Sequence, residues 1–128
     1  MAWEKEQVCV SLEAGGDLST KQFYFVKMSG NTVVICAAAT DIPIGVVQNK
    51  PTSGQSATVC VSGITKVNSD GALTSGWLIG PSSDGQADRK IPGTDTTEYI
   101  CGQVIEGSGA AGELATAAIN CVNPSRAA

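Results

Sequence analysis

Short apolar runs alternate along this chain with turns rich in glycine, asparagine, aspartate and proline. In residues 7–12 every second side chain is apolar, which is typical of a strand with one buried face. Residues 32–37 form an apolar run that begins at Thr32 and lies between turns, as in a strand buried on both faces. The same patterns predict further strands at 23–28, 44–48, 57–61, 64–67, 77–79, 87–91, 98–105 and 117–122.

These segments give about nine or ten short strands at regular spacing and little helix. Such a pattern predicts an all-β protein, built as a compact small β-barrel or a β-tulip-like sandwich. The predicted body is a single β domain over residues 8–122. Residues 1–7 are predicted to form an N-terminal arm, and residues 123–128 a flexible tail.

Part of the chain repeats itself. Leu18 aligns with Leu73, Gly45 with Gly102, and Gly54 with Gly112, and the offset grows by only a few residues between these points. An internal duplication therefore divides the β domain into pseudo-repeats at about 16–62 and 71–120. Neither copy has enough strands to enclose a core alone, so the two are expected to close against each other.

Composition narrows the class of protein. At 128 residues, with 42% hydrophobic and 16% charged residues, the chain is expected to form one domain with its own core. The net charge of −4 and the scattered basic residues disfavour a nucleic-acid partner. No apolar run is long enough for a membrane-spanning helix, and the charged start lacks the apolar part of a signal peptide. A cytoplasmic site of synthesis without membrane association is therefore predicted.

The chain has five cysteines and no CxxC motif. In the internal alignment Cys36 lies over Ile91, Cys60 over Ala118, and Cys101 over Ile44. These apolar counterparts predict that the three thiols are small buried hydrophobic groups rather than members of a disulfide framework.

Few residues can support chemistry. Histidine is absent, which removes the commonest general base and metal ligand. Asp41 and Glu98 occupy matching positions of the two copies and could act as a carboxylate pair, but each also suits the capping of a turn before a strand. We favour capping, and no catalytic, cofactor-binding or metal-binding residue is predicted.

The two tryptophans differ in context. Trp77 lies in an apolar strand and is expected in the core. Trp3 lies in the polar arm, where it either anchors into a partner's pocket or folds back onto its own domain. Tyr24, together with Phe23 and Phe25, is expected to pack rather than to form a sugar-binding platform.

Several motifs resemble those of tailed-phage capsid cement, or head decoration, proteins. The resemblance spans roughly residues 8–122 and consists of glycine, alanine and aliphatic positions. It is carried by Ile44-Gly45-Val46-Val47, Gly54-x-x-Ala57-Thr58-Val59, Asp70-Gly71-Ala72-Leu73, Asp84-Gly85-Gln86-Ala87 and Gly102-Gln103-Val104-Ile105-Glu106. Five cysteines are many for such a protein, and the resemblance does not explain their placement.

The resemblance implies a non-enzymatic structural protein without cofactors. Such a protein binds the outside of a phage capsid as an oligomer, usually a homotrimer, and stabilises the shell by clamping neighbouring major capsid proteins. Its location would be the outer surface of the virion, after assembly in the bacterial host cytoplasm. The alternatives are another β-structural virion component, such as a fibre or tail piece, or a carbohydrate-binding module.

Two regions are candidates for contact. In similar proteins an N-terminal arm often reaches the capsid, which points here to Ala2, Trp3, Glu4 and Lys5. The two copies also differ in the loops 49–54 and 107–112. The candidate residues for oligomer or capsid contact in these loops are Asn49, Lys50, Pro51, Gly107, Ser108 and Gly109.

Overall fold

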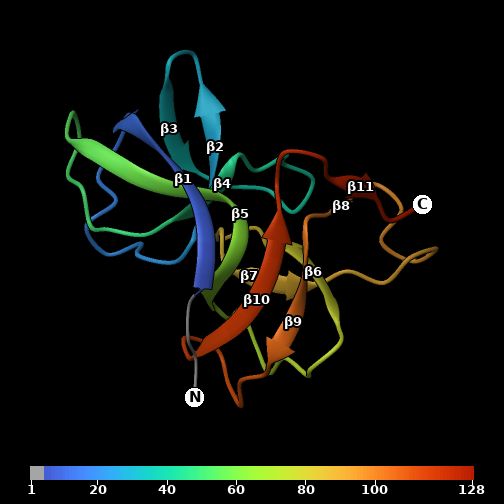
Figure 1. The fold of residues 1–128 in the computed structure, drawn as a ribbon. Helices are drawn as coiled ribbons and strands as arrows, with labels where there is room; N and C mark the ends of the chain where they lie inside the picture. The colour runs from blue at the N-terminus through green and yellow to red at the C-terminus, as the bar shows by residue number, and fades with distance from the viewer. Residues whose placement is uncertain (1–4) are drawn as a thin grey trace.

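The computed structural model describes residues 5–128, which form strands and loops and contain no helix (Figure 1). No helix in this part of the chain could therefore cross a membrane. The strands are β1 (Lys5–Ala14), β2 (Phe25–Ser29), β3 (Thr32–Ile35), β4 (Gly45–Val47), β5 (Ser56–Asn68), β6 (Leu78–Pro81), β7 (Ala87–Arg89), β8 (Tyr99–Ile100), β9 (Gly102–Glu106), β10 (Leu114–Asn120) and β11 (Ser125–Arg126).

Nine strands form one sheet in the order β1-β3-β2-β4-β5-β10-β9-β6-β7, and β8 pairs with β11 in a second, small sheet. The predicted all-β class is confirmed. The large sheet does not close into a single barrel but folds over itself like a sandwich, with the β2–β3 hairpin and the β9–β10 pair at opposite ends of the molecule (Figure 1).

The strand pairings repeat on the two sides of the β5–β10 contact. In the first half β2 pairs with β3 and β4, and β4 pairs with β5. In the second half β6 pairs with β7 and β9, and β9 pairs with β10, all antiparallel as before. The loop contacts repeat as well: the N–H of Leu18 donates to Pro51 O at 2.9 Å, and that of Leu73 to Ser108 O at 3.0 Å.

Strand β5 belongs to both halves. Its first part pairs with β1, and its second part pairs with β10 in the equivalent way. In each half the second strand of the hairpin also makes a parallel contact with the strand that begins that half. Ala14 of β1 lies parallel to Val33 of β3, and Ser69, just after β5, forms a parallel bridge with Ala87 of β7.

Each half has its own apolar core. Leu18, Val26 and Val47 lie at the centre of the first core. Their counterparts Leu73, Ile79 and Val104 lie in the second. Alternation along the strands produces this arrangement, because every second side chain of β2, β4 and β5 points to the same interior.

The outer face of the first half covers the core of the second half. Phe25, Val46 and Cys60 are fully buried and belong to the second core, although their strands lie in the first half. Polar contacts fix this junction. The N–H of Phe25 donates to Gly85 O at 2.7 Å, and the Gln48 amide donates to the Thr65 hydroxyl at 2.9 Å.

The two ends of the chain take part in strands. Strand β1 begins at Lys5, so it includes the last residues of the segment predicted as an arm. In the segment predicted as a flexible tail, Ser125 and Arg126 form β11, and Ala127 is buried, with its N–H donating to Glu98 O at 2.9 Å.

Candidate functional site

The two candidate loops occupy equivalent places in the two halves, and much of each loop supports the fold. In the first loop the Asn49 amide donates to Ser56 O, and its oxygen accepts from Thr58 N–H, both at 3.0 Å. Pro51 is buried. Lys50 is exposed, and it is the candidate of this loop whose side chain is free to reach a partner surface.

The second loop is held by backbone contacts. A Cβ on Gly107 would overlap the carbonyl oxygen of Leu73, so the approach of these two segments requires glycine. The Ser108 hydroxyl lies 2.7 Å from the Ser69 hydroxyl. Gly109 is exposed, and its N–H donates to a Glu113 carboxylate oxygen at 2.8 Å.

Of the four arm candidates, Ala2, Trp3 and Glu4 lie outside the described residues. Lys5 is the first residue of β1, where its backbone pairs with Ile64 of β5. The role of Trp3 stays a prediction.

The carboxylates of Asp41 and Glu98 are each engaged by a lysine of their own half. Asp41 accepts from Lys27 Nζ at 2.9 Å and from the N–H groups of Ala37 and Ala38. Burial raises the pKa of Asp41, but these hydrogen bonds outweigh burial, so its pKa lies below the ordinary value. The predicted turn-capping role of Asp41 is confirmed.

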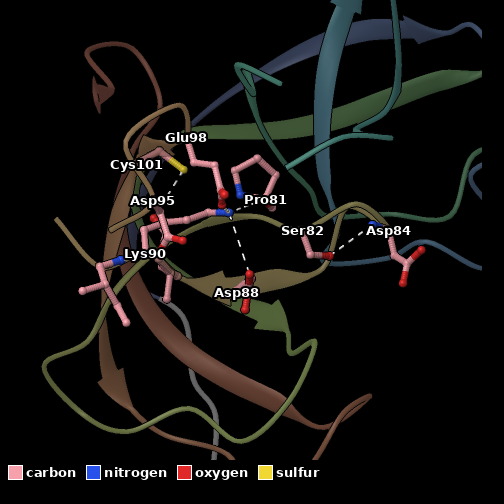
Figure 2. Close-up of polar contacts among 10 residues, drawn as sticks. Pro81, Ser82, Asp84, Asp88, Lys90, Asp95, Glu98 and Cys101 are labelled. Atoms are coloured by element: carbon pink, nitrogen blue, oxygen red, sulfur yellow. Dashed lines mark hydrogen bonds and ion pairs between the residues drawn. The ribbon is translucent and has the colours of Figure 1, made fainter. Parts of the chain in front are cut away.

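A fully buried lysine, missed from the sequence, organises the other carboxylate (Figure 2). Lys90 Nζ lies 2.5 Å from a Glu98 carboxylate oxygen and donates to Pro81 O at 2.8 Å. Asp88 lies farther away at 3.8 Å, and burial raises the pKa of Asp88 above its ordinary value. Lys90 falls in a predicted strand, but strand alternation alone does not identify the acidic partner that neutralises it.

The prediction that three cysteines are small buried groups is confirmed. Cys36, Cys60 and Cys101 are buried, as is Cys121, and Cys9 is exposed. Burial raises the pKa of both Cys36 and Cys60 to about 12. All five thiols are free, and no group of three or more acidic or cysteine side chains in residues 5–128 could hold a metal ion.

Two shallow hollows are notable on the surface of residues 5–128. One, of about 400 Å³, lies where the first half meets the 82–86 turn, with Tyr24, Asp84 and Gln86 in its wall. The other, of about 320 Å³, lies on the outer face of the second half and includes Leu78, Gln103 and Ala118.

Two aromatic rings already have cationic partners. Lys21 Nζ lies 5.0 Å from the centre of the Tyr24 ring, and the Arg89 guanidinium lies 4.1 Å from that of Trp77. Trp77 also packs against the second core, as expected. Each ring therefore has one face occupied, which reduces the aromatic surface that a sugar could stack on.

Comparison with known proteins gives a structural relationship and no sequence family. No family model matches the chain, and no curated protein matches it. The fold is similar to the crystal structure of the head fiber gp8.5 N base in bacteriophage phi29, with a TM-score of 0.62. The two are 18% identical, and the match covers 94% of this chain and 98% of that one. The two chains therefore share a fold along nearly their whole lengths.

Proposed function

We propose that this protein is a non-enzymatic structural component of a phage virion. It binds the outside of the capsid as a trimer and stabilises the shell by clamping neighbouring major capsid proteins. Contact is made by the N-terminal arm with Trp3 and by the exposed parts of the loops, among them Lys50 and Gly109.

The observation that carries this proposal is the whole-length likeness to a phage head fiber base. Nearly all of both chains is matched, so the likeness concerns the complete fold and not one local motif. It agrees with the cement-protein motifs, which lie in the same β domain. Together they favour attachment to a phage head over the carbohydrate-binding alternative.

The fold suits a mechanical role. Its halves share β5, and side chains of the first half complete the core of the second, so the body resists deformation as one unit. Modest single contacts suffice for a trimer, because three linked attachments raise effective affinity by roughly 10²–10⁴. The net charge of −4 also limits adhesion to DNA.

The test uses purified phage heads that lack the protein. The full chain should bind expanded heads and raise the temperature at which they release DNA. Deleting residues 1–4 should weaken binding while leaving the melting temperature of the free protein unchanged, since β1 begins at Lys5. Full binding by the truncated chain would remove the arm from the proposal, and failure of the intact protein to bind any head would remove the proposal itself.

The base of a head fibre is the second candidate, because the matched structure is itself such a base. A fibre base attaches to the head but has no need to stabilise it. Saturating binding with an unchanged temperature of DNA release would therefore favour the fibre base over the cement protein.

A further inference from the structure

The first half contacts the second half through one surface of its sheet. The equivalent surface of the second half is exposed. Phe25 pairs with Val46, and Val46 pairs with Cys60, and all three side chains are fully buried under the second half. By the same register Leu78 pairs with Gln103, and Gln103 pairs with Ala118. Leu78, Gln103 and Ala118 are therefore the counterparts of Phe25, Val46 and Cys60.

This second surface is uncovered by the described residues. Gln103 and Ala118 are exposed, and Leu78 is half-buried. Together with Gly102 and Asn120 they line the hollow of about 320 Å³. We call Leu78, Gln103 and Ala118 the vacant face, since its counterpart in the first half supports a whole neighbouring unit.

The first half has the complementary surface, also uncovered by the described residues. In the second half Thr65 and Pro81 are both buried, and Thr65 accepts a hydrogen bond from Gln48 at the junction with the first half. Their counterparts are Val10 and Met28, as the pairings of β1 with β5 and of β2 with β3 show. Val10 is 40% exposed and Met28 42% exposed. We call these two residues the open end.

We propose that the open end of one copy of this chain binds the vacant face of another copy, head to tail. The occupant is a second copy because the chain already makes this contact once, between its own halves and with the same strand register. Apolar side chains of the open end meet a hollow whose lining is apolar apart from Gln103, Asn120 and Asn123, a mixture common at protein interfaces. A head-to-tail contact forms a ring when its rotation closes, and a three-membered ring gives the trimer of the proposed function, on which this inference rests.

The experiment measures mass in solution from 1 to about 200 µM by light scattering and analytical ultracentrifugation. Met28→Glu alters the open end, and Ala118→Lys alters the vacant face. Each should raise the dissociation constant roughly 30-fold or more, because a charge would be buried without a partner. Leu114→Lys is the matched control, because Leu114 is 37% exposed and lies outside both surfaces. Circular dichroism and thermal melts establish that each variant is folded.

Mixing the two variants distinguishes head-to-tail from symmetric contact. Met28→Glu keeps the vacant face and Ala118→Lys keeps the open end, so an equal mixture should form dimers that do not grow further. A monomeric wild type, unchanged mass in both variants, or an equal effect of Leu114→Lys would overturn the inference.

Two other partners could occupy these surfaces, the chain's own arm or a capsid protein. Each would give a distinct experimental result, and either result overturns the inference. If deleting residues 1–4 converts a monomer into an assembly, the open end holds its own arm. If the variants keep the wild-type mass but lose binding to heads, the surfaces serve a capsid protein. A wild type that assembles head to tail but ignores every head would instead contradict the proposed function alone.

Discussion

Cys36 and Lys90 occupy the same position in the two halves of the molecule. The N–H of Cys36 donates to Phe25 O at 3.1 Å, and that of Lys90 donates to Leu78 O, its counterpart, at 2.8 Å. The sequence alignment of Cys36 with Ile91 was therefore one residue out of register. Cys36 packs in the second core, whereas the Lys90 side chain is buried beside Glu98 and Asp88, so a cluster of charges replaces the apolar contact there.

Glu98→Gln should destabilise the fold by about 3–5 kcal/mol, because it leaves the buried Lys90 ammonium without its close carboxylate partner. Asp88→Asn is the control on the same cluster. It removes the more distant and more exposed carboxylate, so its cost should stay below about 1 kcal/mol. Urea unfolding measures both, and an equal cost for the two variants would contradict the assigned partner.

Asp41→Asn should cost about 1–2 kcal/mol at pH 7, since it removes a capping carboxylate and the partner of Lys27. The pKa of Asp41 in the folded protein lies below its ordinary value of 3.8. Its stabilisation is therefore complete above pH 3.8 and is lost as the pH falls through the folded-state pKa. Unfolding curves between pH 2 and 7 should converge for variant and wild type at the acid end. Asp84→Asn, at an exposed carboxylate, serves as control.

Gly45→Ala should destabilise the protein by about 1–3 kcal/mol through overpacking. A Cβ at Gly45 would overlap the carbonyl oxygen of Cys60, and one at the equivalent Gly102 would lie 2.8 Å from that of Ala118. Gly102→Ala should therefore have the milder effect of the two. Gly16→Ala, with no atom within 4 Å of the added carbon, should change the melting temperature little. A neutral Gly45→Ala would show that the two strands can move apart at low cost.

One thiol should react rapidly with an aromatic disulfide reagent at pH 8, and all five should react after denaturation. Cys9 is exposed, whereas burial raises the pKa of Cys36 and Cys60 to about 12 and suppresses the reactive thiolate. Cys9→Ser should remove the fast phase, and four thiols instead of five should then react after denaturation. Any fast-reacting thiol that remains in the Cys9→Ser variant would contradict the burial of the other four.

The strand pattern predicted most of the fold because alternation reports burial directly. It failed at two places, Gly63 and Cys101. Gly63 was expected to separate two strands, but β5 runs through it with a backbone φ of 122°, a value that glycine adopts without strain. The run 98–105 was expected to be one strand, but it divides at Cys101 into β8 and β9, which belong to different sheets.

The candidate site was less predictable, because its residues contact partners that lie far away in the sequence. Asn49 and Gly107 fall in recognisable loops, yet their contacts with Ser56, Thr58 and Leu73 follow only from the folded pairing. The ion pair of Lys90 depends on the loop between the two residues, which brings Glu98 back beside Lys90, and local composition does not encode that return.

The sharing of β5 has a consequence for load. A force applied through β1 and resisted at β10 must pass along β5, which is hydrogen-bonded to both strands. Such a load shears many backbone hydrogen bonds at once instead of opening them one at a time. The halves therefore cannot be pulled apart at a linker, since the segment that connects them is itself the central structural strand. In the proposed role on a capsid, this continuity would add mechanical strength.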